Sequence, residues 1–259
     1  MLLAYAQLSL RAFTAIFAPL FGHRGWRLSA LFAQMVSIGV ASLPTVCLAN
    51  FLLGIVLAIQ GAGQFEKLGA TAMVANLVAF SILREIGPLI TAVIVIGRSG
   101  SAITAVIVIG RSGSAITAEL GTMKVAEEIE ALNVMGIDPV KFLVVPRLLA
   151  MILMMPVLTV LGEGVGLFAG WLISVTSLHL DPVFYVSNSV DAVEQKDLFT
   201  GLLKALIFGG VVGTVGCFYG IQVEGGAEGV GKATTKSVVT SLTCMLAMDA
   251  LLTALIYFV

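Results

Sequence analysis

The chain has 259 residues, of which 59% are hydrophobic and only 11% are charged, with a formal net charge of −1. Soluble domains contain roughly 45–50% apolar and about 25% charged residues, so this composition excludes an ordinary soluble protein. The near-zero net charge gives no reason to expect nucleic-acid binding. We therefore predict an all-α integral membrane protein, with residues 1–259 forming a single domain.

The N-terminal segment, residues 1–30, differs from a membrane span. Leu10, Phe13 and Phe17 alternate with small and polar residues, and Pro19 interrupts the run. This pattern is typical of an amphipathic helix that lies in the membrane interface. The alternative is an additional early span.

Five later stretches are apolar and long enough to cross a bilayer, which takes about 20 residues. They cover residues 42–63, 68–96, 148–178, 198–221 and 238–259. The sequence therefore predicts five transmembrane helices after the interfacial helix. Glycines recur at four-residue spacing in two of these stretches, as Gly162, Gly166 and Gly170 in one and as the pairs Gly209 and Gly213 and Gly216 and Gly220 in the other. This spacing predicts faces where helices pack closely.

Basic residues set the orientation of such a chain, because cytoplasmic connections carry an excess of Lys and Arg. They concentrate in the N-terminal segment and after the second predicted span, as Arg11, Arg24, Arg27, Lys124, Lys141 and Arg147. We expect the N-terminus and this connection in the cytoplasm. Five spans then place the C-terminus on the opposite side of the membrane, which is the periplasmic side if the chain lies in a bacterial inner membrane.

A tandem repeat begins near the end of the second predicted span. Residues 91–103 and residues 104–116 both read TAVIVIGRSGSAI. Thirteen helical residues advance about 20 Å and rotate the helix face by about 220°, so the two copies place Arg98 and Arg111 differently. Either the helix breaks near the interface, where glycines permit it, or the duplication is recent or erroneous.

A charged segment over residues 117–136 separates two apolar stretches. Val125, Ile129 and Leu132 recur at helical spacing, with acidic residues on the other face. Gly136 is suited to end the helix. The pattern predicts a short amphipathic cytoplasmic helix, which either docks into a soluble partner or lies on the membrane as a solvated connector.

Ionisable residues also occur within the predicted spans, namely Arg84, Glu85, Glu163, Lys204 and Asp249. Such groups are costly in lipid and usually face the protein interior or a watery cavity. They indicate either the polar lining of a substrate path or structural ion pairs between helices.

No enzyme site is indicated. Residues 226–232, GAEGVGK, match the spacing of a phosphate-binding loop, but Ala233 replaces the required Ser or Thr and no strand precedes them. His23 and His179 are isolated. We predict no catalytic residue, no metal site and no cofactor in this chain.

Two long stretches carry a family resemblance. They are ILREIGPL, continued by TAELGTMKVAEEIEALNVMGIDPVKFLVVPRLLA after the repeat, and the C-terminal GGAEGVGKATTKSVVTSLTCMLAMDALLTALIYF. From about residue 30 onward the chain resembles the MlaE-type permeases, also called the YrbE family. The family pattern has one copy of the repeated segment. Arg111 keeps the family's spacing to Glu119, and Arg98 keeps it to Glu85.

The resemblance implies a membrane subunit of an ABC transporter for phospholipids in the bacterial inner membrane. Family members form homodimers, each copy having an interfacial helix and five spans. Each copy engages a separate ATPase, which holds ATP and Mg, through a cytoplasmic coupling helix. An MCE-domain protein docks on the periplasmic side, and some systems add a STAS-domain protein.

The resemblance also implies roles for individual residues. The coupling helix corresponds to residues 118–135, with ATPase contacts at Glu119, Lys124, Glu127, Glu128 and Met135. The lipid cavity corresponds to Leu53, Leu57, Gln60 and Leu77. The intramembrane polar set corresponds to Arg84, Glu85, Lys204 and Asp249. Two other classes of function stay open, an ion-coupled secondary transporter and a non-transporting membrane scaffold.

Overall fold

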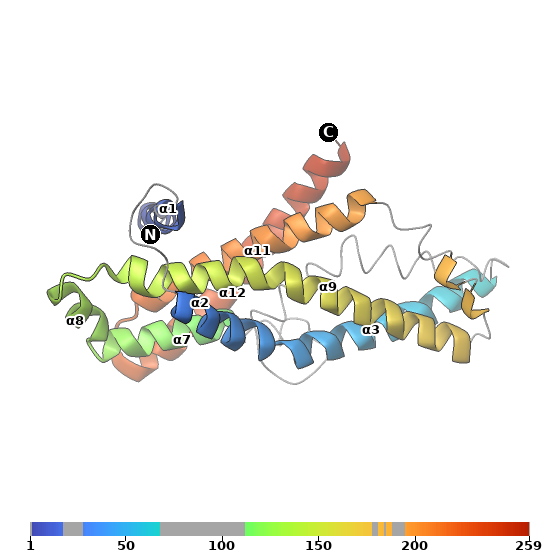
Figure 1. Ribbon diagram of the computed structural model, residues 1–259, viewed down its shortest axis with the longest axis horizontal. Coiled ribbons are helices and arrows are strands. Elements are labelled where there is room, and N and C mark those ends of the chain that lie inside the picture. Colours follow the sequence, from blue (N-terminus) through green and yellow to red (C-terminus); the bar gives the residue numbers. More distant parts are fainter. Residues whose placement is uncertain are drawn as a thin grey trace. The chain divides into compact units, whose positions relative to one another are not determined.

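A computed structural model describes residues 2–17, 28–67, 112–177, 181–183, 185–187 and 195–258 (Figure 1). The described residues form helices and short connections without strands, which confirms the predicted all-α class. In chain order the elements are α1 (Leu2–Phe17), α2 (Leu28–Met35), the π-helical turn η2 (Val36–Val40), α3 (Leu43–Lys67), α7 (Ser112–Val125), α8 (Glu128–Val134), the π-helical turn η4 (Val140–Val144), α9 (Val145–Thr176), α11 (Gln195–Ile221) and α12 (Gly226–Phe258).

Four helical stretches among the described residues are long and apolar enough to cross a membrane. They are Leu28–Val56, Val140–Thr176, Gly201–Ile221 and Gly226–Leu252. Each overlaps one of the predicted spans. The second predicted span, residues 68–96, lies outside the described residues.

Three of these spans begin earlier than the sequence predicts. The first joins α2, η2 and α3 into one stretch, and the second includes η4 before α9. The predicted start of the last span at residue 238 is wrong, because α12 already begins at Gly226. Glycine, threonine and lysine lower the hydropathy of its first turns, but α12 packs along α7 there, and this packing stabilises the helix.

The chain forms two compact units. Unit 1 comprises Met1–Ser42, Ala92–Met155 and Leu206–Val259, and unit 2 comprises Leu43–Thr91 and Pro156–Ala205. The boundary falls within α9 and within α11.

Unit 1 is built on the glycines of α11. A Cβ added to Gly213 would lie 2.9 Å from Leu148 Cδ1 of α9, and one added to Gly220 would lie 2.7 Å from Leu120 Cβ of α7. These separations leave no room for a side chain, so α11 meets both helices through its glycines. The close packing predicted from the glycine spacing is confirmed here.

A buried polar contact joins the same helices. Thr117 of α7 donates through its hydroxyl to the Gly216 carbonyl of α11 at 3.0 Å and contacts Ser237 Oγ of α12 at 2.8 Å. Thr117 and Ser237 are fully buried. Polar contacts of this kind fix the register of helices whose surroundings are apolar.

The N-terminal helix α1 packs against unit 1 through one face. Ala12 and Ile16 are buried, and the Tyr5 hydroxyl lies 2.8 Å from Thr214 Oγ1 of α11. Leu10 and Phe13 are exposed on the other side. The predicted helix is present over Leu2–Phe17, and its position in the membrane interface stays a prediction.

In unit 2, α3 approaches the C-terminal part of α9 through small residues. A Cβ added to Gly162 would lie 2.7 Å from Asn50 Nδ2. One added to Gly54 would overlap the Gly166 carbonyl oxygen. Asn50 is buried and donates through Nδ2 to the Val46 carbonyl at 3.0 Å, so its own helix satisfies this donor.

Candidate functional site

The coupling connection, residues 119–147, runs from the second half of α7 through α8 and η4 to the first turn of α9, and it contains the predicted coupling helix. The prediction of one helix over residues 117–136 is wrong, because the segment folds as the end of α7, a turn, and the separate helix α8 (Figure 1). Glu127 lies at the turn with φ 60° and ψ 13°. Among the described residues it is the only non-glycine residue with a positive φ.

Glu127 serves both helices through its backbone. Its N–H donates to the Lys124 carbonyl at 3.1 Å, which ends α7, and its carbonyl accepts from the Ala131 N–H at 2.9 Å, which begins α8. A left-handed conformation costs a non-glycine residue about 1–2 kcal/mol. The turn therefore depends on contacts that lie outside this residue.

One such contact spans the turn. The Lys124 ammonium, in the last turn of α7, donates to Glu130 Oε1 of α8 and forms an ion pair with it. The same hydrogen bond is the main reason that the pKa of the Glu130 carboxyl lies below its ordinary value of 4.5. Because both side chains are partly exposed, the pair orients α8 more than it stabilises the chain.

We expect α8 to loosen at acidic pH because of this pair. Because the folded-state pKa of Glu130 is lowered, the ion pair with Lys124 contributes fully to the stability of α8 above pH 4.5. This contribution is lost as the pH falls through the lowered pKa. Hydrogen exchange of the α8 amides, corrected for intrinsic rates, checks this between neutral and acidic pH. Glu130→Gln should show the acid-like exchange already at neutral pH. Equal protection of α8 in the variant and the parent chain would contradict the assignment.

The C-terminal end of α8 confirms the predicted stop at Gly136. The Gly136 N–H donates to the Asn133 carbonyl at 3.0 Å and the Ile137 N–H donates to the Leu132 carbonyl at 2.9 Å. Gly136 has φ 72°, the conformation that glycine adopts without steric cost. These paired bonds satisfy the last carbonyls of the helix and fix where the chain turns back.

The two faces of α8 differ sharply. Ile129 and Leu132 are buried, as their spacing predicts, whereas Val125 is exposed because it precedes the turn and does not share their face. Val134 is 89% exposed and Met135 is 63% exposed at the end of the helix. Sequence reasoning missed Val134, although its position two residues after Leu132 already places it on another face.

Acidic side chains accompany this apolar tip. Glu127 and Glu128 are both exposed at the start of α8. We call Glu127, Glu128, Val134 and Met135 the exposed tip. A surface that combines apolar and acidic side chains on a short helix is suited to contact a groove on another protein.

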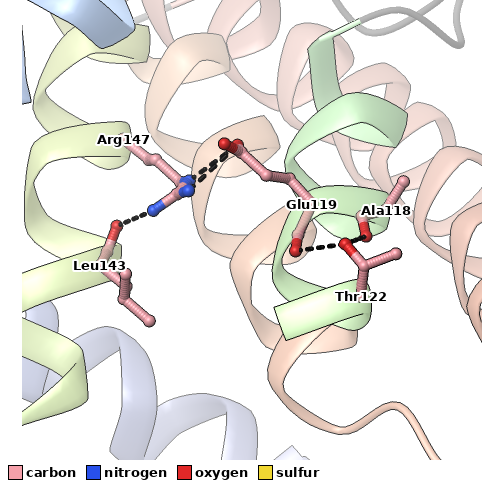
Figure 2. A network of polar contacts seen from close by, with 5 residues as sticks. All are labelled: Ala118, Glu119, Thr122, Leu143 and Arg147. Atoms are coloured by element: carbon pink, nitrogen blue, oxygen red, sulfur yellow. Dashed lines mark hydrogen bonds and ion pairs between the residues drawn. The ribbon is translucent and has the colours of Figure 1, made fainter. Parts of the chain in front are cut away.

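The base of the connection is held by a second ion pair (Figure 2). Arg147 Nη2 of α9 lies 3.0 Å from Glu119 Oε2 of α7, and Nε donates to the same oxygen at 3.3 Å. Nη1 donates to the Leu143 carbonyl of η4 at 2.9 Å. Arg147 is only 5% exposed, whereas about half of the Glu119 side chain is exposed. The structure thus places Glu119 in an ion pair with Arg147, a residue that the sequence indicated only as a marker of orientation.

The predicted lipid-cavity residues are only partly described. Leu53 is half-buried on α3. Leu57 and Gln60 belong to the same helix, but their side chains lie outside the described part, as does Leu77 altogether. Their assignment to a cavity stays a prediction.

The four residues of the predicted intramembrane polar set are not all described, and the two that are described belong to different units. Arg84 and Glu85 lie outside the described residues. Lys204 is buried on α11 in unit 2, and Asp249 lies on α12 in unit 1. Glu163 is buried on α9, and its Oε1 has no hydrogen-bond partner in the described part of the chain.

The described residues contain no group of three His, Cys, Asp or Glu side chains that could hold a metal ion. Residues 226–232, which match the spacing of a phosphate-binding loop, form the first turns of α12. The exposed tip and the ion pair at its base are the candidate functional features of the described residues.

Comparison with known proteins shows the family to which the sequence is similar. A family model described as "Permease MlaE" matches residues 31–107 and 103–255, two stretches that overlap where the copies of the tandem repeat meet. A probable ABC transporter permease protein of Rickettsia typhi is 34% identical over 230 residues, which cover 89% of this chain and 84% of the relative. The intermembrane phospholipid transport system permease protein MlaE of Haemophilus influenzae is 33% identical over 228 residues, which cover 88% of this chain and 82% of the relative.

Proposed function

The chain belongs to the MlaE family of ABC transporter permeases, and from this premise we propose that it moves phospholipid between the inner membrane and a periplasmic MCE-domain protein. A separate ATPase subunit supplies the energy and holds ATP and Mg. The chain itself makes no covalent bond during the cycle. Its apolar spans suit an amphiphilic substrate better than a sugar or an ion.

The exposed tip is the single observation that carries the coupling part of this proposal. Val134 and Met135 expose apolar surface at the end of a helix whose other face is buried. Exposed apolar surface rimmed by polar residues marks an interaction site. We propose that the tip occupies a groove of the ATPase, with Lys124 close to the contact and Glu119 outside it, in its ion pair with Arg147.

The remaining assembly follows the family. A second copy of the chain forms a homodimer, and a STAS-domain protein accompanies the ATPase in some systems. The N-terminus and the exposed tip face the cytoplasm, and the C-terminus faces the periplasm. Leu53, Leu57, Gln60 and Leu77 line the lipid cavity in this proposal, with Arg84, Glu85, Lys204 and Asp249 as its polar set.

Purification from the native membrane tests this function. The full chain, carrying an affinity tag, is extracted gently and its co-purifying proteins and lipids are identified by mass spectrometry. Recovery of an ABC ATPase, an MCE-domain protein and stoichiometric phospholipid supports the proposal. Recovery of the chain alone, free of lipid and active in a gradient-driven assay, would favour an ion-coupled secondary transporter. Recovery of the partner proteins, together with normal lipid transport when the predicted cavity residues are substituted, would favour a non-transporting scaffold.

Charge reversal at the tip should weaken the binding of the ATPase and thereby lower lipid transport. In Glu127→Lys/Glu128→Lys we expect the ATPase recovered with the chain and the transport of lipid to fall about tenfold, the effect of losing roughly 1.4 kcal/mol of binding free energy. The ATPase is quantified by mass spectrometry and the transport by lipid transfer in proteoliposomes.

The double variant Glu224→Lys/Glu228→Lys is the matched control. It reverses two exposed acidic residues of the same unit near the start of α12, outside the exposed tip. Its ATPase recovery and transport should equal those of the parent chain. If the tip variant transported lipid at the parent rate, the coupling assignment would be wrong.

A further inference from the structure

We infer that Glu119 and Arg147 form a clamp at the base of the coupling connection, so that movement of the exposed tip is passed to α7, α9 and α11 together. The two residues are 28 positions apart in the chain; Glu119 lies in the second half of α7 and Arg147 lies in the first turn of α9. The inference rests on the proposed function, because it assigns a transmission role within the ATPase-driven cycle.

The clamp is fixed at more than two points. The Arg147 guanidinium binds the Glu119 carboxylate through Nη2 and Nε and binds the Leu143 carbonyl of η4 through Nη1 (Figure 2). A planar guanidinium held on several sides keeps a defined orientation, unlike the ammonium of a lysine. Arg147 is buried, so this orientation is protected from solvent.

The next residue after each member of the pair packs onto a glycine of α11. Leu120 follows Glu119 and lies against Gly220, and Leu148 follows Arg147 and lies against Gly213. A protein interior packed to this density has no free volume in which one helix moves alone. A displacement at the pair is therefore passed to α11 through both leucines.

The segment beyond the clamp is stiff as well. Lys124 and Glu130 bridge the turn between α7 and α8, and the hydrogen bonds at Gly136 fix the far end of α8. Ile129 and Leu132 bury the inner face of α8. The connection thus has fixed internal geometry from its tip to its base, which a flexible loop lacks.

The alternative role of the pair is structural only, with Glu119 neutralising a buried cation. The two roles differ in the lipid moved for each ATP hydrolysed. A structural defect lowers the amount of working complex and leaves this ratio unchanged. A defective clamp leaves the complex assembled and hydrolysing ATP, and lowers the ratio.

The experiment uses the complex purified through the full chain from its native membrane and placed in proteoliposomes. Fluorescently labelled phosphatidylethanolamine is the lipid probe, and ATP hydrolysis is measured in the same vesicles. For Glu119→Gln we expect the ratio of lipid to ATP to fall at least about fivefold, the lower end of typical coupling between sites. ATPase recovery should equal that of the parent chain. The control Glu228→Gln removes the carboxylate from an exposed ion pair with Lys232 and should leave the ratio unchanged.

Glu119→Asp provides a second variant if Glu119→Gln is not recovered folded. Aspartate keeps the charge that neutralises Arg147 but shortens the side chain by one methylene, so the two contacts at 3.0 and 3.3 Å are lost or lengthened. We expect a lowered ratio at parent levels of assembly. An unchanged ratio in whichever variant assembles would overturn the clamp and leave the proposed function standing. A parent complex that hydrolyses ATP without moving lipid would instead overturn the proposed function.

Discussion

Replacing Glu119 with leucine should lower the free energy of unfolding by about 3 kcal/mol, because it leaves a buried cation without its carboxylate. Arg147 is 5% exposed, and Glu119 is the carboxylate that pairs with it. The expected loss lies at the low end for a broken buried pair, since half of the Glu119 side chain is already exposed. Denaturant titration of the purified chain in mixed micelles measures it.

Removing Arg147 should lower the free energy of unfolding by less than removing Glu119 does. In Arg147→Met the carboxylate of Glu119 turns to solvent, so we expect a loss of about 1–2 kcal/mol from the missing hydrogen bonds. The double variant Glu119→Leu/Arg147→Met should be more stable than Glu119→Leu alone, because it contains no buried charge at this position. Strict additivity of the two single losses in the double variant would show that the two side chains do not interact.

Placing a methyl group on Gly54 should lower the free energy of unfolding by about 2–3 kcal/mol, the range of an overpacked core. The added Cβ would overlap the Gly166 carbonyl oxygen and lie 3.1 Å from Ala169 Cβ. Both obstacles belong to α9, and one of them is backbone, which cannot rotate away. α3 and α9 must therefore separate, and the neighbouring contact between Asn50 and Gly162 weakens with them.

Gly164→Ala is the matched control for this substitution. It lies on α9 in the same unit, and a Cβ there meets nothing within 4 Å. Alanine is favoured over glycine in a helix by roughly 0.8–1.0 kcal/mol, so this variant should be neutral or more stable. Denaturant titration of both purified variants in mixed micelles measures the difference in their free energies of unfolding. A Gly54→Ala chain as stable as Gly164→Ala would mean that α3 and α9 do not meet through Gly54.

Composition and local pattern were sufficient for much of the fold. The excess of apolar residues determines the membrane class, because lipid requires backbone hydrogen bonds to close within helices. Glycines at four-residue spacing predicted the face of α11 that packs against α7 and α9. Gly136 predicted the end of α8, since a positive φ is a property of one residue. Family membership also came from uninterrupted stretches of sequence, and the matching family model confirms it.

Tertiary structure decided what local pattern could not express. Residues 117–136 have the spacing of one helix, yet the chain turns at Glu127 because the Lys124–Glu130 pair and the burial of Ile129 offset the strain there. The early start of α12 depends on its packing along α7. A hydropathy profile contains no information about such contacts between helices. The sequence contains Glu119 and Arg147 but not their contact. They are 28 positions apart, and only the return of the chain from α7 to α9 brings the half-exposed Glu119 carboxylate against the buried Arg147 guanidinium.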